Sequence, residues 1–196
     1  MQSPPREVRT TKQAEQEDLF FGQSVILWAR WSVIVAGTVL VLWTSTDVAL
    51  LTRTMPFFLV LMGVNFFLHG RYVMGSPLNR TAVTVASAVD LILITAIVVF
   101  WPGTPGLNNQ FFVLYFPVVF AFALVFTRKV EAAYTALACV AYTAACFVTG
   151  TVHDEADLKI LVMRLIVIAA LGFLGNYYFR IQRDRLARLS NSQSAA

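Results

Sequence analysis

Charged residues are scarce in this chain: only 13% of its 196 residues are Asp, Glu, Lys or Arg, against about 25% in a typical soluble domain. Cysteine is scarce too. Cys139 and Cys146 lie seven residues apart in one apolar stretch, so along a helix their Cα atoms are about 10 Å apart, too far for an internal disulfide. With 58% hydrophobic residues, the composition excludes an ordinary soluble domain, and the net charge of +4 gives no reason to expect nucleic-acid binding.

Signatures of catalysis and metal binding are also missing. The chain has no GxxxxGK[ST] loop, no HExxH and no GxSxG. Its two histidines, His69 and His153, fall about a membrane thickness apart in the helix arrangement described next, so they cannot share a haem or a metal ion. We therefore expect no enzyme activity, no metal and no cofactor.

What the chain does contain is six long apolar runs with helical character. Most approach the ~20 residues that cross a hydrocarbon layer about 30 Å thick. They predict an all-α, polytopic transmembrane bundle of six helices. The runs are Val25–Trp43, Met55–His69, Thr81–Trp101, Gln110–Phe126, Glu131–Thr149 and Ile160–Phe179.

The positive charges between these runs fall mostly on one side. Only Arg53 and Lys159 lie on the opposite side, and Arg30 and Arg164 lie inside apolar runs. The positive-inside rule therefore predicts that both termini are cytoplasmic in a bacterial inner membrane. The cytoplasmic set is Arg6, Arg9, Lys12, Arg71, Arg80, Arg128, Lys129, Arg180, Arg183, Arg185 and Arg188.

Three regions follow from this pattern: a polar cytoplasmic segment at 1–19, a transmembrane domain at 20–180 and a basic cytoplasmic tail at 181–196. We expect a flexible N-terminal start, with one turn of helix near Gln13–Asp18. Thr44–Thr54 is predicted to be an outer loop, with Val48 as the earliest start of the second helix and Pro56 then in an early turn. Pro117 is predicted to kink the fourth helix.

An acid and a base occur at similar depth in the first and third helices. Asp90 lies midway along the third helix, where a carboxylate is expensive and marks a candidate functional site. Arg30 lies at comparable depth, so we predict an Arg30–Asp90 pair, with Trp28 and Trp31 covering the guanidinium. The pair either fixes helix register or senses a proton or ligand; a neutral, protonated Asp90 is the further alternative. The polar half of the third helix is Thr81, Thr84, Ser87, Asp90 and Thr95.

Two further features lie in the fifth and sixth helices. Arg164 is one turn inside the outer end of the sixth helix; it either extends to the outer headgroups or closes a pocket against Asp157 or an anionic ligand. A weakly polar stripe runs down the fifth helix, where it forms a packing seam or a ligand wall. The stripe is Thr135, Cys139, Tyr142, Cys146 and Thr149.

The last third of the chain carries a recognisable pattern. It consists of Phe112–Phe126 followed by Arg128, then Tyr134–Ala138, Asp157–Lys159 with Val162 and Arg164, and GFLGNYYFRIQR from Gly172 to Arg183. This pattern resembles the membrane input region of bacterial six-helix sensor histidine kinases, in which the last helix continues through an Arg-rich segment into a signalling helix. No phosphoacceptor His segment or ATP-binding lid occurs here, so kinase activity is not carried over. The resemblance then implies an input module, an orphan relative of one, or a membrane region cut from a longer protein.

These observations predict a non-enzymatic, sensor-type module that passes a membrane or lipophilic signal to a cytoplasmic partner. Its partners would be the lipid bilayer and other membrane or cytoplasmic subunits. One alternative is an accessory or structural subunit of a larger membrane complex. Another is the solute-binding subunit of a vitamin-type transporter, with a pocket built from Arg164, Asn108, Asn109, Gln110 and the acidic loop near 155. The output of this module would be a C-terminal helix at Arg180–Leu189. The basic residues with an output or lipid-anchoring role are Arg180, Arg183, Arg185 and Arg188.

Overall fold

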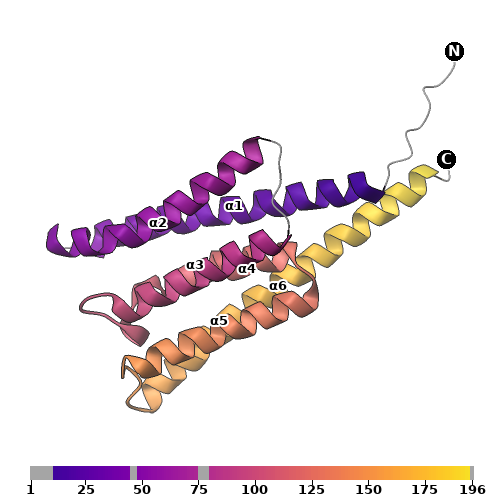
Figure 1. Ribbon diagram of the computed structural model, residues 1–196. Helices are drawn as coiled ribbons and strands as arrows, with labels where there is room; N and C mark the ends of the chain where they lie inside the picture. The colour runs from indigo at the N-terminus through magenta and orange to yellow at the C-terminus, as the bar shows by residue number, and fades with distance from the viewer. Residues whose placement is uncertain (1–10, 45–47, 75–79, 195–196) are drawn as a thin grey trace.

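The structure is a computed structural model in which residues 11–44, 48–74 and 80–194 are described. Over these residues the chain is all-helical, with roughly antiparallel helices, and the start of α1 and the end of α6 lie at the same end (Figure 1). The α-helices are α1 (Thr11–Thr44), α2 (Val48–Val73), α3 (Arg80–Phe100), α4 (Tyr115–Val125), α5 (Arg128–Val148) and α6 (Glu155–Ser194), and two 3₁₀ helices, η1 (Gly106–Asn108) and η2 (Gln110–Leu114), precede α4.

Four helical segments are long and apolar enough to cross a membrane, as judged by length and composition. They are Gly22–Trp43, Thr81–Phe100, Arg128–Val148 and Glu155–Ile181. Two further apolar segments, Phe58–Val73 and Gln110–Val125, are shorter. An all-helical chain with membrane-type helices is thus confirmed, whereas the six crossings and the orientation stay predictions.

Both ends of the bundle are more helical than predicted. Helix α1 begins at Thr11 and not near residue 20, and α6 continues through the basic tail to Ser194 without a break at 180. The prediction used hydropathy to place helix ends. Neither extension contains Gly or Pro, and both are rich in good helix formers such as Gln, Glu, Arg, Leu and Ala, so helical propensity continues where hydropathy falls. The expectations for residues 1–10, Arg6 and Arg9 included, lie outside the described residues.

The fourth helix also differs from the prediction, whereas the second begins at the earliest residue predicted for it. Helix α2 begins at Val48, so most of the predicted outer loop is helical, and Pro56 lies inside the helix, where it removes the hydrogen bond to the carbonyl of Thr52. The fourth run is split into η2 and α4. Pro117 therefore lies in the first turn of α4, where its missing N–H costs no hydrogen bond, and no interior kink at this residue is required.

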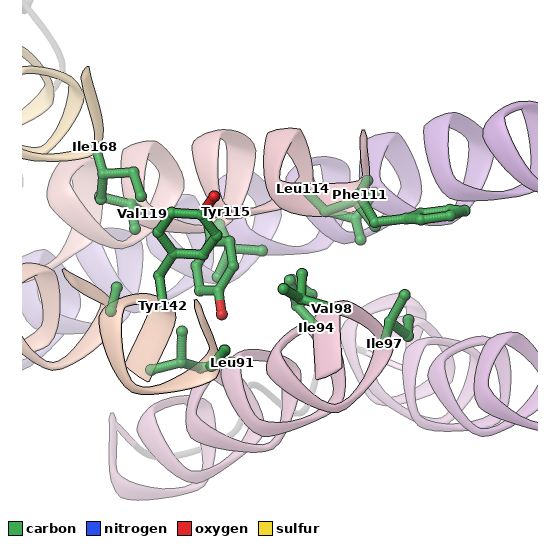
Figure 2. Packing of buried hydrophobic residues seen from close by; sticks show 14 of the residues in the cluster. Leu91, Ile94, Ile97, Val98, Phe111, Leu114, Tyr115, Val119, Tyr142 and Ile168 are labelled. Carbon is green, nitrogen blue, oxygen red and sulfur yellow. The ribbon is translucent and has the colours of Figure 1, made fainter. Parts of the chain in front are cut away.

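Helix α4 occupies the middle of the bundle, where it contacts α1, α3, α5 and α6. Because other helices surround most of it, its 11 residues do not have to match the lipid thickness alone. Apolar side chains from every described helix meet in the core, part of which is shown in Figure 2. They include Leu91, Ile94, Ile97 and Val98 of α3, Phe111 and Leu114 of η2, Tyr115 and Val119 of α4, Tyr142 of α5 and Ile168 of α6.

Candidate functional site

Arg30 of α1 and Asp90 of α3 form the ion pair predicted from their depth. Arg30 Nη2 lies 2.6 Å from Asp90 Oδ1, and their side chains are only 4% and 3% exposed. Arg30 shares its helix face with the buried Ile26, Val33 and Ile34, which rotate the guanidinium inward. Either charge alone would be costly in an apolar interior, and the pair joins α1 to α3.

Two nitrogen atoms of the Arg30 guanidinium do not take part in the ion pair. Among the described residues, the buried Nε and Nη1 atoms of Arg30 have no hydrogen-bond partner. Two small cavities flank the pair, each with about 10 Å³ of space for the centre of a water molecule, which is close to what one water needs. Val118 lines both cavities; Leu61 lines one and Ser87 the other. The pair is thus enclosed between α1, α2, α3 and α4.

The expected tryptophan cover is wrong. Trp28 is 70% exposed on the outside of α1. The ring of Trp31 instead packs edge-on against Phe66 of α2, with centroids 5.3 Å apart. Trp28 therefore faces the surroundings of the bundle, and Trp31 helps to hold α1 against α2.

Asn65 is a buried polar residue that the prediction missed. It is fully buried, and both atoms of its side-chain amide lack a partner among the described residues. Its neighbour Phe66 touches Trp31, the neighbour of Arg30, so Asn65 lies at the depth of Arg30. Its position as the one amide in the apolar run from Phe57 to Leu68 was the available signal.

The polar half of α3 is only partly confirmed. Ser87 is buried, and its carbonyl accepts a hydrogen bond from the Tyr134 hydroxyl at 2.8 Å. Thr95 shares a 2.8 Å hydrogen bond with the Tyr115 hydroxyl. Thr81 is exposed, because it is in the first turn of α3.

Arg164 of α6 turns into the bundle and does not pair with Asp157. Its Nη1 donates to the carbonyl of Leu107 and to the Tyr142 hydroxyl, each at 2.7 Å. The guanidinium carbon lies 3.7 Å from the ring centre of Phe112, a cation–π contact. Asp157, the expected counter-charge, accepts instead from the backbone N–H of His153 at 3.0 Å. Neutral oxygens and an aromatic face therefore hold Arg164.

A sharp corner presents the Leu107 carbonyl to Arg164. Gly106 has φ +61°, a left-handed conformation that favours glycine, and a Cβ there would overlap the hydroxyls of Thr149 and Thr151. The Thr151 hydroxyl accepts from the backbone N–H of Leu107 at 2.9 Å. The loop after α5 thus fixes the turn before α4.

The weakly polar stripe of α5 faces inward. Thr135, Tyr142 and Cys146 are buried, and Cys139 and Thr149 are half-buried. The Thr149 hydroxyl donates to the carbonyls of Ala145 and Cys146 in its own helix. The ring of Tyr142 packs edge-on against Tyr115, with centroids 5.6 Å apart (Figure 2). These contacts suit a packing seam.

Glu131 is a second residue that the prediction missed. It is only 5% exposed at the start of α5, and it accepts a 3.0 Å hydrogen bond from Thr135. Gly172 of α6 lies against both: a Cβ there would be 2.7 Å from Glu131 Oε1 and 2.6 Å from Thr135 Oγ1. A Cβ on Gly175 would lie 2.8 Å from the Cβ of Ala123 on α4. Helix α6 thus meets α5 and α4 through glycines. The sequence signal that could have identified Glu131 is its position four residues before Thr135, the first residue of the polar stripe.

The remaining predicted residues are dispersed. Asn109 is buried and accepts from the backbone N–H of Phe111 at 2.7 Å, whereas Asn108 and Gln110 are exposed. Arg180 is exposed on α6. Arg183, Arg185 and Arg188 belong to α6, but their side chains are outside the description.

No three His, Cys, Asp or Glu side chains gather as a metal site in the described part of the chain. Comparison with known proteins finds no matching family model, no matching curated protein and no matching solved structure.

Proposed function

We propose that this chain is a six-span protein of a bacterial inner membrane with both termini in the cytoplasm. Four membrane-type helices support this, together with two shorter apolar ones packed against them. The start of α1 and the end of α6 lie at the same end of the bundle (Figure 1), as an even number of crossings requires. Lys and Arg are concentrated on that side in the sequence.

Cysteine-accessibility labelling tests this topology. The native Cys139 and Cys146 are replaced by alanine, and single cysteines are introduced at the exposed Asn108, Glu155 and Thr127. Asn108→Cys and Glu155→Cys should react with a membrane-impermeant maleimide from the periplasm, and Thr127→Cys only after the membrane is opened. Labelling of Thr127→Cys in intact spheroplasts would exclude the proposed orientation.

Within this topology, the protein acts as a non-enzymatic, sensor-type input module that passes a membrane or lipophilic signal to a cytoplasmic partner. The observation that carries this proposal is helix α6. It is continuous over 40 residues, about 60 Å at 1.5 Å per residue, while its membrane-type part ends at Ile181. One rigid element therefore joins the bundle to the basic segment beyond it, as an output helix requires.

The bundle also provides contacts through which α6 can be moved. Arg164 bonds α6 to η1 and α5, and Gly172 and Gly175 bring it against α5 and α4. Helix α4 in turn packs on α1, which carries Arg30. A change at the Arg30–Asp90 pair therefore has a packed route to α6.

Distance measurements between spin labels test this coupling. One label is attached at Thr127→Cys, between α4 and α5, and the other at Ser190→Cys, in the α6 extension, in the background lacking native cysteines. The distance between the two labels is measured in liposomes with and without Asp90→Asn. We expect the mean distance to change by about 1–2 Å or more, as in other helix shifts. Glu155→Gln, the same chemical change on a 92% exposed side chain, is the matched control and should change nothing. Identical distributions for all three proteins would refute the coupling.

An accessory subunit of a larger complex is the second candidate. The observation in its favour is the outer face of α5, where the small residues Ala132 and Ala136 are exposed beside Leu137 and Val140; small residues four apart allow close approach of another helix. Mass spectrometry of the intact assembly, purified in mild detergent, separates the two candidates. Stoichiometric membrane partners would favour the accessory subunit, and a lone monomer or dimer would favour the input module.

A further inference from the structure

Arg164 keeps one edge of its guanidinium unused. Nη1 is occupied by Leu107 and Tyr142, and one face is covered by Phe112. Within the described part of the chain, no carboxylate pairs with it, and Nε and Nη2 make no hydrogen bond. The Nε–Nη2 edge is the side of a guanidinium that presents two parallel N–H donors, the arrangement that accepts a carboxylate in a bidentate manner.

The surface of α6 next to Arg164 is apolar and exposed. Arg164 is half-buried, and its neighbours on α6 include Ile160, Met163 and Val167, which are 45%, 62% and 40% exposed. In a membrane these side chains face acyl chains. A cation with an unused bidentate edge thus lies beside a surface that suits an alkyl chain, which is the complement of an amphipathic anion.

We propose that Arg164 binds the carboxylate of a long-chain fatty acid from the outer half of the membrane. The carboxylate takes the Nε–Nη2 edge, and the alkyl chain lies along Ile160, Met163 and Val167. This ligand would be the lipophilic signal of the input module, and in that respect the inference rests on the proposed function.

Depth favours a single-chain carboxylate over a phospholipid phosphate. Lys159, with a 78% exposed side chain, marks the polar end of α6, and Arg164 lies five residues further along, about 7.5 Å deeper. A bilayer phosphate would have to sink by that distance with its glycerol and second chain. A fatty acid carries nothing above its carboxylate, so it reaches this level at lower cost.

Binding is tested with the full chain in phosphatidylcholine nanodiscs and deuterated oleate, with native mass spectrometry counting the oleate retained per chain. The titration is made at pH 9, where the fatty acid carboxylate is ionised. We expect one oleate per chain, with methyl oleate, which has the same alkyl chain without the charge, failing to compete. Equal competition by methyl oleate would overturn the proposal without any need for a variant.

Variants then identify the residue. Arg164→Gln should weaken oleate binding about ten- to hundredfold, the range for a charge-assisted hydrogen-bonded contact. Arg164→Lys keeps the charge but loses the two parallel N–H donors of the guanidinium. Its affinity for oleate should lie between those of the unaltered chain and Arg164→Gln. Lys159→Gln is the matched control and should bind as the unaltered chain does. Oleate retained undiminished by Arg164→Gln would overturn the assignment, as would displacement of oleate by an equal amount of phosphatidylglycerol.

Failure of this inference and failure of the proposed function give different results. The spin-label distances report whether α6 responds to the Arg30–Asp90 pair and require no ligand. If the chain binds no oleate but the position of α6 still changes on Asp90→Asn, the fatty acid site is refuted and the proposed input function stands. If the chain binds oleate at Arg164 but α6 does not respond to Asp90→Asn, the proposed input function is refuted and the fatty acid site stands.

Discussion

Removal of the Asp90 charge should strongly destabilise the bundle. Asp90→Asn leaves the Arg30 guanidinium without its counter-charge in a position where it is 4% exposed, and Nε and Nη1 have no partner among the described residues. Breaking a buried pair by removing one member typically costs 3–5 kcal/mol. The lower figure applies here, because a membrane protein unfolded in detergent keeps part of its helical structure and finds other partners for Arg30. We expect a loss of about 3 kcal/mol in the free energy of unfolding.

Reversible unfolding in mixed micelles, followed by circular dichroism as sodium dodecyl sulfate is added, measures this loss. The double variant Arg30→Met with Asp90→Leu removes both charges, so it should recover most of the stability, because replacing a buried pair by apolar residues is often neutral or favourable. Glu155→Gln should stay within about 0.5 kcal/mol of the unaltered chain, since exposed ion pairs contribute little. A loss below about 1 kcal/mol for Asp90→Asn would refute the reasoning and indicate that Asp90 is already neutral.

Three further predictions follow from the packing. Gly172→Ala should cost about 1–3 kcal/mol in the same assay, because its Cβ would meet Glu131 and Thr135, whereas Gly63→Ala, with nothing within 4 Å, should stabilise α2 by up to about 1 kcal/mol; equal effects would contradict the proposed α5–α6 contact. Asn65→Leu should be nearly neutral or stabilising, because it removes two buried atoms that have no partner among the described residues, and a large loss would indicate that the amide is bonded. Tyr142→Phe should cost about 1.5–3 kcal/mol in the free energy of unfolding, the range for a hydrogen bond to a charged group, and an unchanged unfolding curve would show that Arg164 does not depend on it.

Hydropathy and charge were enough to predict the helices and one polar contact between them. The Arg30–Asp90 pair followed from depth alone, because a carboxylate and a guanidinium within apolar helices have few other partners. The same method placed the helix ends wrongly. It ended the sixth apolar helix near residue 180, where hydropathy falls, and predicted an output helix at Arg180–Leu189. The absence of Gly and Pro after Gly175 favours one continuous helix to Ser194.

The hydrogen-bond partners of Arg164 could not be predicted from the sequence. Its acceptors are a tyrosine hydroxyl of α5 and the Leu107 carbonyl, and the second is a backbone atom that every residue carries. Which carbonyl meets the guanidinium depends on the path of the chain between α3 and α4, and no side-chain pattern encodes that path. Asn65 and Glu131 were missed for a different reason, because each is a single polar residue in or beside an apolar run.

The corner at Gly106 limits how this sequence can vary. Its φ of +61° disfavours any other residue, and a side chain there would push against Thr149 and Thr151, which hold the turn through Leu107. Displacing Leu107 would remove an acceptor from Arg164. A position without any chemistry of its own should therefore be among the least replaceable in homologous sequences, and a natural variant with another residue at 106 should also have lost arginine at 164.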